Sequence, residues 1–503
     1  MKGNKEFYCI YNQLYKDAIK AYKQGKEEKC YELIKTAATT AYTFNQFFFD
    51  SKLEILLKKN TELIHKTSIN KDTTTSLTSK KRIVFFDTNG LDNRGLTQQY
   101  IRAFFSLNYS VLYIYIDGNE DATTNNPKTI EEIKNYSDSK IAVFSKKQKY
   151  TEKIKKIIQI VKEFNADYIF SHLMPWDVVS LAVIYIFRNI KSYNINLTDE
   201  AFWLGASFFD YNIEFRNYGY TISLEKRLFK PEQLLYLPYY PIIPLYQEEF
   251  KGFPSNIPPH SIKIFTGGNF YKIFDKENSF FKLMDTILQN NENAIILIAG
   301  NGNMREFYKR LRRLSNKNRI FYIGVRKDIN EVFKRCDIYL STYPISGALM
   351  AQYAALNAKP IIAYTDKRLI DNKLEEIICY NTKQQLTNYN IDITIKKSIE
   401  LCTNEAQRVK EGTLLQKAII SKNQFNQILY DILNHKSQLS IIKDYIDYQY
   451  IAQVYLNIRN EILNDIIILL IKVYKYRFLI KFPSLIPYIP TCMIRKIYDR
   501  IKN

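Results

Sequence analysis

Hydrophobic and polar positions alternate along residues 81–235 in a pattern typical of a parallel α/β sheet. Short β-rich apolar runs are separated by segments whose apolar residues recur at helical spacing. The expected strands are 83–86, 111–116, 141–144, 168–170 and 193–197, and the helices between them include 97–107, 153–164 and 178–187. Buried apolar strands that alternate with helices predict a Rossmann-like domain here.

A second alternation of the same kind covers residues 261–420. Its expected strands are 262–265, 294–299, 320–323, 338–340 and 360–363, with helices near 280–289, 304–314 and 347–356. Between the two patterns, residues 236–260 contain six prolines. Because proline fixes its own φ and keeps the preceding residue extended, this stretch is predicted to be an interdomain linker. Two such domains are expected to bind ligands at the carboxyl ends of their strands.

The two ends of the chain show helical periodicity. Residues 1–66 are predicted to form a helical hairpin with a break at Gln24–Lys26 and a packing or oligomerisation role, followed by a polar linker at 67–80. Residues 421–503 are predicted to be helical and basic, with eight Lys or Arg against the single Asp499 between positions 472 and 502. Residues 466–503 therefore suit an anionic membrane surface, or alternatively a helix that packs back on the first domain.

The charge of the chain is strongly positive. Its 503 residues contain 72 Lys and Arg against 51 Asp and Glu, a formal net charge of +21. Such an excess favours anionic partners, although a general drift toward lysine would produce it as well. No recognisable nucleic-acid-binding module occurs, so no nucleic-acid partner is expected.

Cysteine spacing and hydropathy bear on the compartment. The six cysteines are far apart, with no CxxC motif and no paired histidine, so neither a disulfide framework nor a zinc site is expected. The N-terminal residues lack the apolar core of a signal peptide, and the longest aliphatic run, 466–471, is far shorter than a spanning helix. We therefore expect a cytoplasmic protein, at most peripheral at the inner face of the cell membrane.

Residues suited to phosphate binding follow successive strands of the second pattern. Glycine next to a strand end lets the backbone approach a ligand, and a helix N-terminus attracts anions. The candidates are Gly267, Gly268, Asn269, Lys272, Gly300, Arg326, Ser346, Gly347 and Ala348. Each has an ordinary alternative: a solvated lysine, a basic loop or a strand-end turn. Their joint placement after successive strands favours a binding site.

The order and spacing of residues 262–364 resemble the donor-binding half of GT-B glycosyltransferases, both the group-1 and the O-GlcNAc-transferase-like enzymes. The stretch GNFYKIFDKENSFFKLMDTILQNNENAIILIAG is similar to the strand, helix and second strand of the latter. The resemblance implies two Rossmann-like domains and a nucleotide-sugar substrate, first of all a UDP-sugar, with no cofactor. It places Lys272 on the diphosphate, Val325 and Arg326 by the base, and Ser346–Ala348 at the phosphate-binding helix start.

The chain departs from this family at its acidic positions. Ile345 and Tyr353 stand where group-1 retaining enzymes have two glutamates, and Leu349 and Met350 stand where the other group has polar residues. The donor sugar and the stereochemistry of transfer therefore stay open. No Asp-x-Asp motif occurs where a divalent ion would bridge a diphosphate, so no metal is expected.

Candidate residues for the acceptor side lie in the first α/β pattern. An inverting transfer needs a base for the acceptor hydroxyl. Asp199, in a loop after a strand, is the first choice and His172 the second, while Glu200 occupies a slot that related enzymes often fill with histidine. The alternatives are a helix N-cap for Asp199 and a structural histidine for His172. Asn93 or Arg94, in the first strand–helix turn, is expected to meet the acceptor or the leaving phosphate.

These observations predict a Leloir glycosyltransferase of polysaccharide biosynthesis. It would transfer a sugar from a nucleotide sugar to a surface-glycan or lipid-linked saccharide acceptor. The alternative is a non-catalytic GT-B-like scaffold that binds a glycan, a peptide or a sister glycosyltransferase, which the missing carboxylates favour. A sugar-nucleotide epimerase is disfavoured by the basic tail.

Overall fold

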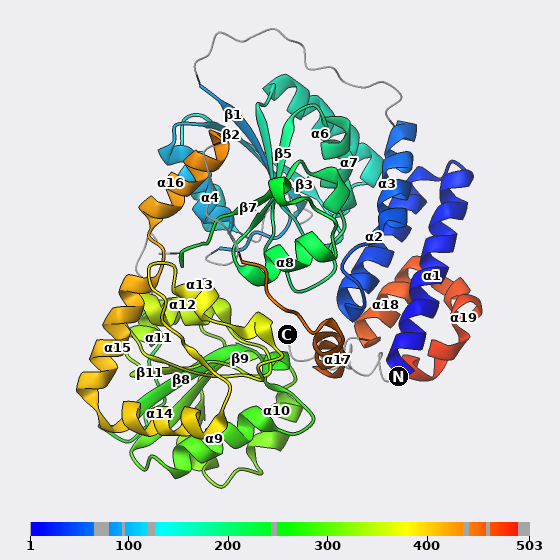
Figure 1. Cartoon of the computed structure of the whole chain (residues 1–503). Helices are drawn as coiled ribbons and strands as arrows, with labels where there is room; N and C mark the ends of the chain where they lie inside the picture. The colour runs from blue at the N-terminus through cyan, green and yellow to red at the C-terminus, as the bar shows by residue number, and fades with distance from the viewer. Residues whose placement is uncertain are drawn as a thin grey trace. The chain divides into compact units, whose positions relative to one another are not determined.

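The computed structural model describes residues 2–64, 80–92, 96–118, 126–242, 249–435, 442–458 and 463–490. The chain forms two compact units (Figure 1). The first unit comprises Met1–Leu237, Ile428–Lys443 and Arg459–Asn503, and the second comprises Pro238–Gln427 and Asp444–Ile458. The chain first passes from one unit to the other between Leu237 and Pro238, inside the stretch predicted as a linker. Segments of the C-terminal region then return to each unit.

The first unit contains a seven-stranded parallel sheet in the order β3-β2-β1-β4-β5-β6-β7. Its strands are β1 (Arg82–Asp87), β2 (Ser110–Gly118), β3 (Ser139–Ser145), β4 (Tyr168–His172), β5 (Lys191–Ile195), β6 (Tyr211–Glu214) and β7 (Leu234–Tyr236). Buried aromatic and aliphatic side chains fill the central strands, which explains the continuous apolar runs in the sequence. Sequence periodicity missed β6 and β7 because they are only four and three residues long.

Helices connect these strands, as a parallel sheet requires. They are α4 (Thr97–Ser106), α5 (Pro127–Lys134), α6 (Tyr150–Phe164), α7 (Val178–Ile186) and α8 (Asn217–Glu225). Asp177 starts α7 by accepting hydrogen bonds from the amides of Val179 and Ser180. Helix α16 (Lys422–Leu433) is divided between the units. Its residues from Ile428 on belong to the first unit.

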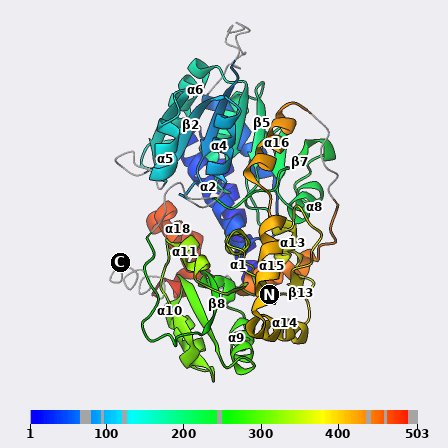
Figure 2. The same ribbon diagram turned by 90° about the vertical axis from the view of Figure 1, so that its left-hand side faces the viewer.

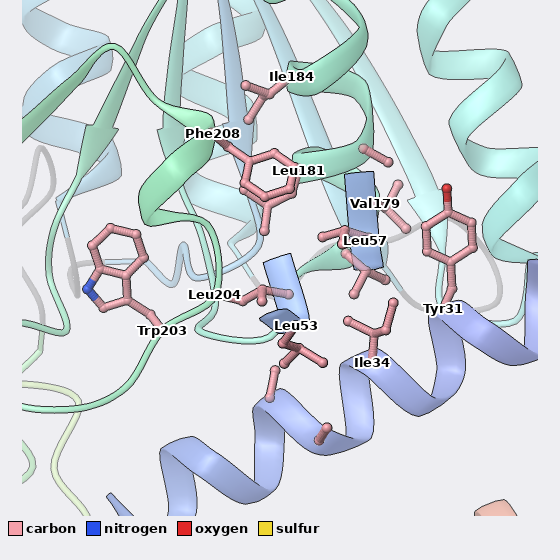
Figure 3. Close-up of a cluster of buried hydrophobic side chains, with 14 of the residues drawn as sticks. Tyr31, Ile34, Leu53, Leu57, Val179, Leu181, Ile184, Trp203, Leu204 and Phe208 are labelled. Carbon is pink, nitrogen blue, oxygen red and sulfur yellow. The ribbon is translucent and has the colours of Figure 1, made fainter. Parts of the chain in front are cut away.

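Three N-terminal helices, α1 (Lys2–Lys23), α2 (Glu27–Phe44) and α3 (Ser51–Ile64), pack on the same unit. The turn between α1 and α2 falls at Gly25, where φ is +64°. It lies inside the break predicted at Gln24–Lys26. Figure 3 shows Ile34 of α2 and Leu53 and Leu57 of α3 against Val179 and Leu181 of α7. The helices thus share one hydrophobic core with the sheet.

Polar contacts fix the helical segment to two loops of the α/β part. The buried carboxylate of Glu54 accepts hydrogen bonds from the amides of Gly205 (2.6 Å), Ala206 (2.9 Å) and Ser207 (2.9 Å). Burial raises the pKa of Glu54 above its usual value, although these donors oppose the shift. The loop that follows β5 is therefore held in place by α3.

A second such contact joins α2 to the end of β2. Asp117 lies between two ammonium groups, with Lys35 Nζ at 2.9 Å and Lys153 Nζ at 3.0 Å from its carboxylate oxygens. Burial works against the charged carboxylate, but the two lysines outweigh it and lower the pKa of Asp117 to about 2.

The described part of the basic tail packs on the N-terminal helices. It consists of α18 (Leu463–Tyr474), the short helix α19 (Phe478–Lys481) and a 3-10 segment at Pro483–Tyr488. Its buried side chains, which join the hydrophobic core of the first unit, are Ile466, Ile467, Leu470, Val473, Tyr474, Phe478, Phe482 and Leu485. Asp17 of α1 accepts from Tyr474 Oη at 2.8 Å and from Lys481 Nζ at 2.7 Å. The apolar run 466–471, part of the stretch predicted to suit a membrane surface, thus contributes to this core: Ile466, Ile467 and Leu470 are buried, and the other three pack against it.

The second unit contains a six-stranded parallel sheet in the order β10-β9-β8-β11-β12-β13. Its strands are β8 (Ile262–Asn269), β9 (Ala294–Asn301), β10 (Ile320–Tyr322), β11 (Ile338–Leu340), β12 (Ile361–Tyr364) and β13 (Thr387–Asn388). All but the two-residue β13 lie where the apolar runs predict strands. The prediction of two parallel α/β sheets is confirmed.

Helices of the second unit cover its sheet and include one from the C-terminal region. They are α9 (Ser279–Gln289), α10 (Met304–Leu311), α11 (Ile329–Lys334), α12 (Ala348–Leu356), α13 (Glu375–Ile378), α14 (Ile391–Thr403), α15 (Glu405–Ala418) and α17 (Tyr448–Ile458). Helices α9 and α14 lie side by side below β8 in Figure 2. Helix α17 is attached by hydrogen bonds from Tyr450 to Asp366 and from Tyr455 to Asp371. None of the helices in the described ranges is both long and apolar enough to traverse a bilayer.

Candidate functional site

Two loops at the carboxyl edge of the second unit's sheet meet at Lys272. This lysine lies in a short 3-10 segment, Phe270–Ile273, directly after β8. Its Nζ donates a hydrogen bond to the carbonyl of Ser346 at 3.1 Å, and its own carbonyl accepts from the amide of Ile345 at 3.2 Å. The loop after β11 is thereby joined twice to the loop after β8. The structure brings together two of the segments that the sequence selected for phosphate binding.

The ammonium group of Lys272 therefore lies beside the start of α12. Gly347 is the N-cap of this helix, and no side chain in the described part of the chain caps it. The first intrahelical bond to the cap runs from the amide of Ala351 to the carbonyl of Gly347. The amides of Ala348, Leu349 and Met350 precede it and have no acceptor within the helix. A lysine and a helix N-terminus at one place create a positive potential that suits a diphosphate.

A buried asparagine holds the loop that precedes α12. Asn372 accepts from the amide of Ser346 at 2.8 Å and donates to the carbonyl of Pro344 at 2.7 Å and to Thr365 Oγ1 at 2.9 Å. Sequence reasoning missed Asn372 because it lies eight positions beyond β12 in no motif. The sequence signal that could have found Asn372 is its position after β12, a strand of the same sheet.

The glycines near the ends of β8 and β9 serve different purposes. Strand β8 extends through Asn269, so Gly267 and Gly268 lie within it and pair with Ala299 and Gly300. A Cβ on Gly267 would lie 2.8 Å from the carbonyl oxygen of Ala299, and one on Gly300 would lie 1.9 Å from that of Gly268. Gly267 and Gly300 thus allow the two strands to approach. Gly268, with φ +143°, presents its open side toward Lys272, and Asn269 is exposed at the strand end.

Val325 and Arg326 lie in the loop after β10 with opposite orientations. Val325 is 52% exposed, whereas Arg326 is buried. The Arg326 guanidinium forms an ion pair with Asp328 (Nε to Oδ1, 2.8 Å) and donates to the carbonyl of Gly252 at 2.7 Å. Its side chain also lies over the ring of Phe250. The structure therefore gives Arg326 a role in fixing its own loop, and only Val325 of this pair is open to the surface.

The positions at which the resemblance to GT-B enzymes predicts acidic or polar residues have apolar or structural roles here. Leu349 and Met350 lie in the first turn of α12 and are half-buried. Tyr353 is buried, and its Oη donates to the carbonyl of Ile242 at 3.2 Å. No carboxylate at these positions replaces the missing glutamates.

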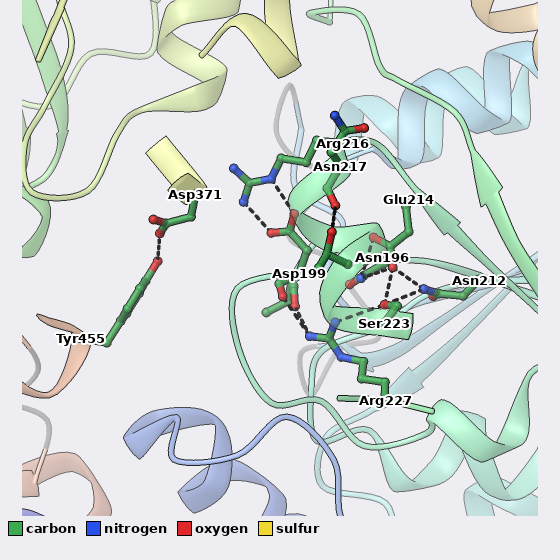
Figure 4. A network of polar contacts seen from close by, with 12 residues as sticks. Asn196, Asp199, Asn212, Glu214, Arg216, Asn217, Ser223, Arg227, Asp371 and Tyr455 are labelled. Atoms are coloured by element: carbon green, nitrogen blue, oxygen red, sulfur yellow. Dashed lines mark hydrogen bonds and ion pairs between the residues drawn. The ribbon is translucent and has the colours of Figure 1, made fainter. Parts of the chain in front are cut away.

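Asp199, the first choice for a base, lies in a buried ion pair (Figure 4). Both of its carboxylate oxygens accept from Arg216, Oδ2 from Nε at 2.5 Å and Oδ1 from Nη2 at 2.7 Å. The Arg227 guanidinium also donates to the backbone carbonyls of Asp199 (2.9 Å) and Ala201 (2.7 Å). Asp199 caps no helix, and its pairing ties the loop after β5 to the residue that precedes α8. Glu200 is half-buried, and its carbonyl accepts at 2.7 Å from Asn45, the C-cap residue of α2.

A second acid, which the sequence did not single out, lies in the same network. Glu214, at the end of β6, is fully buried and accepts hydrogen bonds from Asn196, Asn212 and Ser223. Burial raises its pKa to about 7, and Arg227 and the hydrogen bonds from Ser223 and Asn196 oppose this shift only in part. No sequence motif marks Glu214, because its donors come from the loop after β5, from β6 and from α8.

His172, the second choice for a base, lies at the end of β4 in a buried polar cluster. Its Nδ1 is 3.0 Å from Thr97 Oγ1 and 3.4 Å from Asp87 Oδ1. Thr97 donates its single hydroxyl proton to Asp87 Oδ2 at 2.7 Å, so toward His172 it acts as an acceptor. In the neutral imidazole, Nδ1 therefore carries the proton and Nε2 the lone pair. Nε2 has no hydrogen-bond partner among the described residues.

Asp87 is the orienting group of this cluster. It ends β1, is buried, and also accepts from Tyr113 Oη at 2.7 Å and from the amide of Gly90 at 2.6 Å. Burial opposes its ionised form, but His172, Thr97 and Tyr113 outweigh burial and lower the pKa of Asp87. An acid directly after the first strand was the signal for it in the sequence.

Asn93 and Arg94 lie outside the described residues, and nothing follows about them. Among the residues that the structure does describe, no group of three or more His, Cys, Asp or Glu side chains is arranged to hold a metal ion.

Comparison with known proteins relates this architecture to solved structures. No family model matches the chain, and no curated protein matches it in sequence. HepE of Anabaena, crystallised with UDP and glucose, superposes with a TM-score of 0.51 at 13% identity, covering 71% of this chain and all of HepE. A glycosyltransferase of Rickettsia africae superposes with a TM-score of 0.50 at 12% identity, covering 71% of this chain and 98% of its own. The chain therefore has the fold of the GT-B glycosyltransferases.

Proposed function

We propose that this protein is a glycosyltransferase that binds a nucleotide-sugar donor in its second unit. The observation that carries the proposal is the position of Lys272 Nζ beside the uncapped start of α12, at the carboxyl edge of a GT-B sheet. A UDP-sugar is the first candidate donor, since HepE, which has a similar fold, was crystallised with UDP and with UDP-glucose.

The chemistry of the proposed site is stabilisation of the leaving diphosphate. Negative charge grows on the phosphate oxygen as its bond to the sugar breaks. Lys272 and the amides at the start of α12 would meet that charge, and Asn372 keeps the preceding loop in position. Donors that are fixed before the reaction stabilise a developing charge without reorganisation.

For the acceptor proton, the hydrogen-bond pattern supports His172 over Asp199. Both side chains are buried, so their exposed fractions do not favour one candidate over the other. Asp199 is occupied by Arg216 on both oxygens, whereas His172 is oriented by Asp87 and Thr97 with the lone pair of Nε2 unused. A base held by a carboxylate at its other nitrogen is the usual arrangement for histidine general-base catalysis. The acceptor itself is proposed to be a surface-glycan or lipid-linked saccharide.

Nucleotide binding tests the donor site directly. The melting temperature of the full chain is measured with UDP, GDP or CMP, for the wild type, Lys272→Ala and Lys276→Ala. Lys276 is an exposed lysine four positions further along the same loop and serves as the matched control. We expect one nucleotide to raise the melting temperature of the wild type and of Lys276→Ala, and a much smaller rise for Lys272→Ala. An equal rise in all three proteins would remove Lys272 from the site.

The alternative is a scaffold that has lost catalysis, and it also has an observation in its favour. Leu349 and Met350 make the first turn of α12 apolar where similar enzymes carry polar or acidic groups. If no nucleotide changes the melting temperature, and Lys272→Ala leaves the function in the cell intact, the scaffold is the better interpretation.

A further inference from the structure

The described C-terminal segment has a second apolar side that does not pack on the protein. Tyr476, Leu479 and Ile480 are 71%, 50% and 77% exposed, and Ile486 and Tyr488 are also exposed. We call these five residues the tail surface. They lie within thirteen positions of each other, in the short helix α19 and the 3-10 segments on either side of it. Exposed apolar residues gathered in one short segment mark an interaction site more often than scattered single ones do.

The tail surface is presented by a firmly attached segment. Phe478, Phe482 and Leu485 alternate with its residues in the sequence and point into the core of the first unit. Lys481 adds an ion pair to Asp17 of α1 at 2.7 Å. Packing on the N-terminal helices therefore accounts for one side of this segment only. Folding does not require the other side to be apolar.

Charge identifies the kind of partner. Residues 466–490 contain Lys472, Lys475, Arg477 and Lys481 and not a single Asp or Glu. Lys481 is paired with Asp17, while Lys472, Lys475 and Arg477 are exposed next to the tail surface. Aliphatic side chains, tyrosines and unbalanced cations together are the composition of segments that lie in the interface of an anionic membrane.

We propose that the tail surface docks on an anionic lipid bilayer. Leu479 and Ile480 enter the boundary of the acyl region, Tyr476 and Tyr488 lie at headgroup level, and Lys475 and Arg477 contact lipid phosphates. The residues that face the lipid differ from the aliphatic run 466–471, in which Ile466, Ile467 and Leu470 are buried and the other three pack against the core. The proposal does not depend on sugar transfer, because the donor site belongs to the other unit.

Vesicle binding by the full chain tests this proposal. Deleting the segment would also remove its core residues Phe478, Phe482 and Leu485, so the test uses surface substitutions. The triple variant Tyr476→Ser/Leu479→Ser/Ile480→Ser is compared with a control that changes three exposed apolar residues of the second unit, Ile393→Ser/Val409→Ser/Tyr445→Ser. Co-sedimentation is measured with vesicles of phosphatidylglycerol and phosphatidylcholine, and with phosphatidylcholine alone.

The expected results separate the apolar and the ionic contributions. The wild type and the control variant should sediment with the anionic vesicles, and the triple variant should lose most of this binding. Lys475→Gln/Arg477→Gln should bind about 30-fold more weakly, since each cation near an anionic surface contributes about 1 kcal/mol. Binding should fall in high salt and be weak on phosphatidylcholine alone.

Three outcomes would overturn the proposal: no sedimentation of the wild type with anionic vesicles, equal binding of wild type and triple variant, or lipid-free dimers that only the triple variant abolishes. The last result would mean that a second copy of the chain covers the tail surface. Unchanged circular dichroism and an unchanged nucleotide-induced melting shift show that the triple variant is folded. If it is not, Ile480→Ser alone, at the most exposed position, replaces it.

Discussion

Glu214 gives the sharpest test of the electrostatics of the first unit. Its pKa of about 7 lies above the ordinary 4.5, chiefly because burial penalises the charged carboxylate. The folded protein therefore keeps a proton that the unfolded chain releases. Stability that involves Glu214 is greatest below pH 4.5 and falls as the pH rises through 7. The interval between 4.5 and about 7, at ~1.4 kcal/mol for each pH unit, corresponds to about 3 kcal/mol.

The substitution Glu214→Gln removes this titration, because glutamine resembles the neutral acid at every pH. We expect the free energy of unfolding of the variant, relative to the wild type, to increase by about 3 kcal/mol between pH 4.5 and pH 8. Urea unfolding monitored by tryptophan fluorescence measures it, since both tryptophans, Trp176 and Trp203, lie in the first unit. Glu232→Gln, at an exposed position of the same unit, is the control.

A difference between Glu214→Gln and the wild type that stays constant from pH 4.5 to 8 would refute this reasoning. It would mean that Arg227, together with the hydrogen bonds from Asn196, Asn212 and Ser223, keeps Glu214 ionised despite its burial. The buried network would then contain two carboxylates and two guanidinium groups in balance.

Three further predictions concern the first unit. Glu54→Ala leaves the amides of Gly205, Ala206 and Ser207 without their acceptor, and should reduce the free energy of unfolding by about 3 kcal/mol in the same fluorescence assay; an unchanged value would show that α3 does not hold this loop. Asp117, with its pKa lowered to about 2, contributes stability that is present above pH 4 and is lost as the pH falls toward 2, so the wild type should lose stability on acidification more steeply than Asp117→Asn. Asp87→Asn should lower the transfer rate by about 10³-fold or more while leaving the nucleotide-induced melting shift intact; an unaltered rate would exclude the Asp87–His172 pair from proton transfer.

Several features of this protein are determined locally and were therefore readable in the sequence. Apolar runs such as 294–299 predict buried parallel strands, because a strand covered on both faces needs no polar alternation. The location of Lys272 and of the start of α12 at the same edge of the sheet also follows from sequence, because parallel strands place all their carboxyl ends at one edge. That the two are neighbours depends on the strand order, in which β8 pairs with β11.

Other features were decided only by the tertiary structure. Asp199 was selected for its place after a strand, but its partner Arg216 comes from beyond β6, and no spacing rule links the two. The preference for His172 depends on which atom receives the hydroxyl proton of Thr97, and that is fixed by Asp87 on another strand. In the tail, periodicity shows that apolar residues exist, but not which side the N-terminal helices cover. Periodicity is a property of neighbouring residues, whereas pairing and burial depend on distant segments that only the folded chain brings into contact.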